Sequence, residues 1–176
     1  MVLFGMSKFK LSNTLQITID EAEGLIKKYF EATKQLKSYL DKCSKYGLKN
    51  GYIRSFKPYS GIRFFPQWKE NLDSWEDKKI IGEITRASYN TPIQSTAALM
   101  TKLALYKIRN YIQENDLNNK VKLIHVVHDA VYVECLEELS EEFSKIMSDL
   151  MIQAGKDFKL ELEMGTDITI SNCWTK

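Results

Sequence analysis

The sequence has few cysteines, few prolines and almost no net charge, and each shortage excludes a class of protein. Cys43, Cys135 and Cys173 are odd in number and form no CxxC pair, which argues against a disulfide framework or a structural zinc site. Reduced thiols are typical of an intracellular compartment. Only three prolines occur in 176 residues, and no repeat or Gly/Pro/Ser-rich linker is found. We therefore interpret the chain as one continuous unit.

Long apolar segments are also missing. The first ten residues, MVLFGMSKFK, lack the basic segment and long apolar core of a signal peptide. No apolar run approaches the roughly 20 residues that a membrane-spanning helix needs. These absences predict a cytoplasmic protein with no membrane partner. The formal net charge is only +2, so any DNA-binding surface must be a local patch.

Helical periodicity dominates the first half of the chain. Residues 18–21 fit a capping box, in which the Thr18 hydroxyl and the Glu21 carboxylate accept hydrogen bonds from free backbone N–H groups. Apolar residues then recur at helical spacing, which predicts one long helix ending at Gly47. Asn50 and Gly51 are typical of a hairpin turn, and a strand is expected over residues 52–54.

The middle of the chain predicts a loop and two further helices. Residues 61–66 are interpreted as a loop, and Ser74 is expected to cap a helix. Pro92 should interrupt that helix, because proline lacks the amide donor and clashes with the preceding turn. A second long helix is expected from Ile93 through Ile112.

The last third predicts a hairpin and a helix. Residues 121–127 and 131–133 are rich in β-branched residues and form two predicted strands, with His128-Asp129-Ala130 at their connection. A helix is expected over residues 138–153, followed by two short closing strands over 160–164 and 168–170. The predicted fold class is α+β, with long helices packed on a small antiparallel sheet.

Asp129 lies between two apolar strands. A carboxylate buried there without a partner would cost several kcal/mol on an order-of-magnitude scale, so it must be exposed, hydrogen-bonded or bound to a cation. Mg²⁺ is usually held by one or two carboxylates together with phosphate oxygens, which makes Asp129 a candidate metal ligand. Taken alone, an aspartate that merely forms the turn is the more common interpretation.

Arg86, Asn90 and Gln94 are spaced four residues apart, so on a helix they share one face. A cation and two amides are groups that contact phosphates, sugars and base edges. A solvated polar face explains the same pattern equally well.

In combination, these motifs resemble the family A DNA polymerases. The order is an aromatic–Gly–Met at residues 4–6, then R-x3-N-x3-Q ahead of a long helix, then V-H-D between strands. The similarity extends over nearly the whole chain, including the helical segment 20–45, Gly165 and Trp174. It implies one partial polymerase domain over residues 1–176, with fingers-derived helices and a hairpin in 1–90 and part of the palm in 91–176.

The resemblance also implies roles for individual residues. Asp129 matches the aspartate that ligates the catalytic Mg²⁺ ions, and His128 matches the histidine that contacts the primer terminus. The polar row matches residues that line the primer–template DNA. Phe4 stands where the family usually has a tyrosine that stacks at the templating position, and Gly5 allows the backbone to turn beside it. The implied partners are primer–template DNA and a dNTP.

Two departures from the family pattern bear on activity. No D-x-S-x-x-E-like segment occurs, so the chain offers one ligand to a two-metal site, and the triphosphate-binding Lys and Arg are also missing. Ala130 stands where most members have Glu, while Ser95 and Leu99 are milder changes. These differences suggest a divergent member of the kind that phages encode. We expect the isolated chain not to extend a primer.

Three interpretations stay open at this point. The chain is the C-terminal portion of a polymerase completed by a second polypeptide, a non-catalytic remnant that binds primer–template DNA, or a truncated gene product. The low net charge disfavours tight autonomous DNA binding, because such affinity depends largely on phosphate neutralisation.

Overall fold

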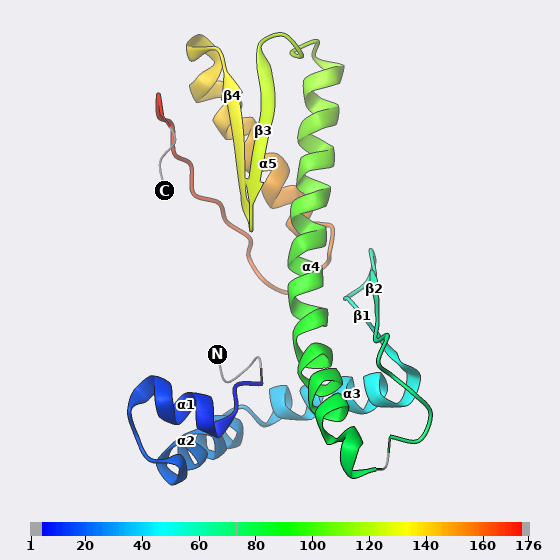
Figure 1. Cartoon of the computed structure of the whole chain (residues 1–176). Helices are drawn as coiled ribbons and strands as arrows, with labels where there is room; N and C mark the ends of the chain where they lie inside the picture. Colours follow the sequence, from blue (N-terminus) through cyan, green and yellow to red (C-terminus); the bar gives the residue numbers. More distant parts are fainter. Residues whose placement is uncertain (1–4, 73, 174–176) are drawn as a thin grey trace. The chain divides into compact units, whose positions relative to one another are not determined.

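The computed structural model describes residues 5–72 and 74–173, which form helices and two small antiparallel sheets (Figure 1). The predicted α+β class is confirmed. Each sheet has two strands, β1 with β2 and β3 with β4. The elements in chain order are α1 (Lys8–Leu15), α2 (Ile19–Ala32), α3 (Lys34–Asn50), β1 (Tyr52–Arg54), β2 (Ile62–Phe64), the 3₁₀ turn η2 (Trp75–Asp77), α4 (Lys78–Glu114), β3 (Val121–Val127), β4 (Ala130–Cys135), the 3₁₀ turn η3 (Glu137–Leu139) and α5 (Ser140–Lys156).

The chain divides into two compact units. The first contains residues Met1–Phe56 and Ser60–Ser95, and the second contains Lys57–Tyr59 and Thr96–Lys176. The first part of α4 therefore belongs to one unit and its second part to the other. The expected division into fingers-derived residues 1–90 and palm residues 91–176 stays a prediction.

The capping box at the start of α2 is confirmed, but the helix that follows is shorter than predicted. The Glu21 carboxylate accepts a hydrogen bond from the Thr18 backbone N–H at 2.9 Å. The expected single helix is broken at Thr33, whose φ of −121° and ψ of 51° are not helical. The Thr33 hydroxyl donates to the Tyr29 carbonyl at 2.8 Å, a local bond that competes with helix continuation. Hydrophobic spacing alone did not reveal this break.

The end of α3 corrects two predictions. The helix passes Gly47 and runs to Asn50, and Gly51 ends it with a left-handed φ of 75°. Asn50 and Gly51 therefore form a helix terminus rather than a hairpin turn. Residues 61–66 are not all loop, because β2 pairs antiparallel with β1 in the register Tyr52↔Phe64.

Gly47 lies where α3 packs against the first part of α4. A Cβ at this position would overlap the Ser88 hydroxyl oxygen and would lie 3.1 Å from Cε2 of Phe65. Ser88 is fully buried, and Ser44 and Thr85 bridge the same two helices through their hydroxyls at 3.0 Å. The absence of a side chain at residue 47 therefore permits the close approach of α3 and α4.

Gly47→Ala is expected to destabilise the chain, although alanine has the higher helix propensity. Overpacking a tight contact costs about 1–3 kcal/mol, which exceeds the propensity gain of about 1 kcal/mol. The matched control is Gly24→Ala in α2, where an added Cβ meets nothing within 4 Å. Denaturant unfolding should show opposite signs for the two variants. A stabilised Gly47→Ala protein would contradict the packing described here.

Helix α4 begins as expected and then continues through its proline. Asp77 accepts from the Ser74 backbone N–H at 3.0 Å and pairs with Lys69 at 2.8 Å. The hydrogen bond from Lys69, helped by Ser74, lowers the pKa of Asp77 to about 2, so the cap stays ionised at neutral pH. The predicted interruption at Pro92 is wrong, because α4 is continuous with Pro92 fully buried inside it. Burial of the surrounding turn overrides the local cost of proline.

The second unit is built around one apolar cluster. Ile108 and Ile112 of α4, Val121 of β3 and Phe143 of α5 are all at most 4% exposed. Figure 1 shows α5 alongside the hairpin of β3 and β4. The helix predicted over 138–153 is confirmed with shifted ends: residues 138 and 139 belong to η3, and α5 begins at Ser140, includes Gly155 and ends at Lys156. The cluster fixes the base of the hairpin whose turn carries the candidate residues.

The two predicted closing strands are wrong. Residues 160–164 and 168–170 form neither helix nor strand, although Met164 contacts Gly155 and Thr166 bonds the Ser148 hydroxyl at 2.5 Å. A strand needs a hydrogen-bonded neighbour, and no neighbour pairs with these segments among residues 5–72 and 74–173. In this described part, no helix has the length and apolar character needed to span a bilayer.

Candidate functional site

The tip of the β3–β4 hairpin carries the two residues that the sequence singled out most strongly. Val127 pairs with Ala130, so His128 and Asp129 alone connect the strands. His128 has a φ of 55°, a conformation that few non-glycine residues adopt. Both side chains are exposed. The expected strand–turn–strand arrangement is confirmed, except that Ala130 belongs to β4 rather than to the connection, so the two-residue turn carries one imidazole and one carboxylate.

The Asp129 carboxylate offers a single oxygen-donor group. It is exposed, and the neighbouring Ala130 adds no ligand. Within the part of the chain that is described, no three His, Cys, Asp or Glu side chains gather as a metal site. One exposed carboxylate fits Mg²⁺ as a partial donor set, because this ion is commonly held by one or two carboxylates plus phosphate oxygens and water.

The polar row lies on the first part of α4. Arg86 and Gln94 are exposed and Asn90 is half-buried. Gly5 lies against Arg86, since a Cβ on Gly5 would be 3.1 Å from Cγ of Arg86. The φ of Gly5 is 76°, so glycine provides the backbone turn expected there. Phe4 and Trp174 lie outside the described residues.

Two further side chains border this row and were not singled out from the sequence. Arg63 donates from Nη1 to the Thr91 hydroxyl at 3.4 Å, which places a second, exposed cation beside the row. The position of Arg63 was missed because the sequence pattern of residues 61–66 was interpreted as a loop rather than as a strand. Tyr89 lies beside Gly5, and burial raises the pKa of its phenol, so the hydroxyl stays neutral at physiological pH.

The sequence model of DNA polymerase family A matches residues 1–176. The chain belongs to this family. Family A relatives include DNA polymerase I of Thermus aquaticus, 25% identical over 98% of this chain and 19% of the relative. DNA polymerase I of Caldicellulosiruptor bescii is 30% identical over 87% of this chain and 17% of the relative. The chain thus spans about a fifth of the length of these relatives.

A solved family A structure has a similar fold. The POL domain of Pol1 from M. smegmatis, in complex with DNA primer-template and dNTP, matches with a TM-score of 0.74 and 25% identity. The match covers 87% of this chain and 25% of that chain. The resemblance noted from the sequence is therefore confirmed at the level of family and fold.

Proposed function

We propose that this chain forms part of the palm and fingers of a template-directed DNA polymerase, which adds nucleotides to a DNA primer. The observation that carries the proposal is the family A match over residues 1–176 together with the exposed His128–Asp129 turn. The M. smegmatis domain binds DNA primer-template and dNTP, and we assign the same partners to this chain.

In this proposal, Asp129 is a catalytic metal ligand. Its carboxylate would hold Mg²⁺, which supplies positive charge to stabilise the attacking and leaving oxygens of phosphoryl transfer. His128 would contact the primer terminus through an imidazole N–H. The exposed turn gives both side chains access to a large substrate.

Arg86, Asn90 and Gln94 would contact the primer–template DNA. The arginine suits a phosphate, and the amides suit sugars and base edges. Phe4 would stack on the templating base, with Gly5 providing the adjacent turn. Stacking tolerates every base identity, as a polymerase requires.

The remaining catalytic groups would come from outside this sequence. The second metal-binding carboxylate and the cations for the triphosphate have no counterpart in the motifs found here. We propose that they lie on another segment of the same polypeptide or on a second polypeptide. Either arrangement leaves Asp129 as the contribution of this chain to the metal centre.

Arg86→Ala tests the DNA-binding part of this proposal. Loss of one phosphate contact should weaken primer–template binding by the purified chain roughly tenfold near 0.1 M salt and should reduce the salt slope by about 1. Fluorescence anisotropy across a salt series measures both quantities. The matched control is Lys79→Ala, which removes another exposed cation from α4. Equal losses in the two variants would refute a specific role for Arg86.

A further inference from the structure

Helix α3 concentrates positive charge in a chain whose net charge is close to zero. The formal net charge of the whole sequence is +2. A single acidic residue, Asp41, occurs in α3, whereas lysine occupies five of its positions: Lys34, Lys37, Lys42, Lys45 and Lys49. This helix is therefore the local basic patch that DNA binding by a near-neutral protein requires.

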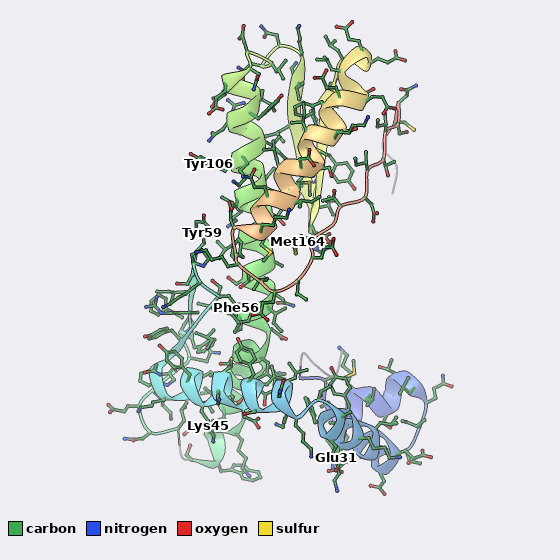
Figure 2. The ribbon with its side chains drawn as sticks, turned by 180° about the vertical axis from the view of Figure 1, so that it is seen from behind. Glu31, Lys45, Phe56, Tyr59, Tyr106 and Met164 are labelled. Carbon is green, nitrogen blue, oxygen red and sulfur yellow. The ribbon has the colours of Figure 1, made fainter. Side chains whose placement is uncertain are left out.

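The patch surrounds a hollow where α2 passes into α3. The hollow has a volume of about 410 Å³, within the size range of small-molecule sites. Figure 2 labels Lys45 on α3 and Glu31 near the end of α2. The hollow is lined by one aromatic ring, four lysines and two other polar residues: Phe30, Lys34, Lys37, Ser38, Asp41, Lys42 and Lys45.

One lysine of the hollow is already neutralised. Lys37 pairs with Asp41 at 2.6 Å and lies 5.3 Å from the centre of the Phe30 ring. The hydrogen bond from Lys37 to Asp41 raises the pKa of Lys37, so this lysine stays charged at neutral pH. Asp41, the one carboxylate among the described residues that line the hollow, is thus balanced by its neighbour.

Three lysines remain available to a ligand. Lys34, Lys42 and Lys45 are exposed, and none of them has an ion-pair partner among the side chains that the structure describes. Their spacing of eight and three residues keeps them on one side of α3, spread over about 16 Å at 1.5 Å per residue. A linear polyanion matches this arrangement better than a single small anion.

We propose that this hollow binds single-stranded DNA, with Lys34, Lys42 and Lys45 on its phosphates and Phe30 against a base. Lysines that follow a backbone beside an aromatic ring are the usual means of binding unpaired strands. A hollow of nucleotide size admits an unstacked base, whereas the bases of a duplex remain stacked inside the helix. The identification of this strand as unpaired template rests on the proposed function, but the binding itself does not.

The experiment compares the wild-type chain with the combined variant Lys34→Ala, Lys42→Ala and Lys45→Ala. The probe is a labelled oligo-dT strand, and a blunt DNA duplex serves as the second ligand. For a single strand, each lost phosphate contact lowers the salt dependence of log K by about 0.7. Removing three lysines should therefore reduce this slope by about 2 and weaken the affinity by roughly tenfold or more. Binding of the blunt duplex should change much less.

Two controls separate this effect from a general loss of charge, and a third variant tests the stacking contact. Combined Lys120→Ala, Lys122→Ala and Lys145→Ala removes the same charge from exposed positions of the second unit and should leave oligo-dT binding nearly unchanged. Combined Lys→Arg changes at the three α3 positions should restore the salt slope. Phe30→Leu should weaken binding several-fold without changing that slope, because stacking is not ionic.

The proposal is overturned if the α3 and control triple variants bind oligo-dT equally well. It is also overturned if the α3 variant loses as much affinity for the blunt duplex as for oligo-dT. An α3 triple variant with an unchanged melting temperature rules out unfolding as the cause. These outcomes are independent of Arg86 and Asp129. If the lysine variants do not affect oligo-dT binding, the proposed polymerase function is not contradicted. If the chain proves to have no polymerase function, the oligo-dT measurement still tests the lysines.

Discussion

Under the proposed polymerase function, Asp129→Asn is expected to lower primer extension about 10³-fold. The amide keeps the size of the side chain and removes the negative charge that a divalent ion needs from its ligand. Losing metal-dependent charge stabilisation of about 4 kcal/mol corresponds to this factor. The rate is measured with saturating primer–template, Mg²⁺ and dNTP, on protein purified through a tag on this chain.

Glu134→Gln provides the matched control for this result. Glu134 is an exposed carboxylate on β4 of the same hairpin, so the change in charge is identical, but it pairs with Lys122 near the base of the hairpin and lies away from the turn. Its rate should remain within about threefold of wild type, because surface substitutions away from a site are usually nearly neutral. Similar rates for both variants would remove Asp129 from the catalytic metal site and leave the turn-forming interpretation in its place.

The site-bearing hairpin could be predicted from sequence because its signals are local. Residues 121–127 alternate and are rich in β-branched side chains, and the polar pair His128 and Asp129 interrupts the apolar pattern at the turn. The capping box at Thr18 is local in the same sense, since its donors and acceptors lie within three residues. Features of this kind depend on residues close together in the sequence, so the sequence alone is enough to predict them.

The errors occur where contacts distant in sequence decide the outcome. Pro92 stays inside α4 because its turn is buried, and Gly47 is a packing position against Ser88 rather than a helix end. β2 exists because it pairs with β1, whereas residues 160–164 alternate between apolar and acidic side chains as a strand would but pair with none of the residues that the structure describes. Local propensity cannot distinguish these cases, because each depends on a partner elsewhere in the fold.

The candidate site shows the same division. Asp129 and the polar row were singled out from residue types and spacing, whereas His128 and the roles of all these residues came from the resemblance to the family and stay predictions. Arg63 was missed because its position beside Thr91 depends on the pairing of β2. The lysines of α3 gave a signal in the sequence, since Lys34, Lys42 and Lys45 share a helical face. The near-zero net charge of the whole chain obscured that signal, and a charge count for each helix would have found it.

Ile108→Ala is expected to destabilise the second unit by about 2–5 kcal/mol. Ile108 is fully buried in the cluster with Ile112, Val121 and Phe143. Truncation removes apolar contacts from α4, β3 and α5 at once, and the surrounding side chains refill such a cavity only in part. At about 2–4 °C per kcal/mol, the melting transition should fall by at least about 4 °C. Calorimetry or circular dichroism measures the shift.

Ile124→Ala is the matched control, because it makes the same truncation at an exposed position outside the core. Ile124 lies on β3 at the irregularity between Leu123 and His125, and it is 52% exposed. The same truncation there should change stability by about 0.5 kcal/mol or less. Primer extension should fall with rising temperature in the Ile108 variant, because the cluster holds the hairpin that carries Asp129. Equal melting temperatures for the two variants would show that this cluster does not support the hairpin.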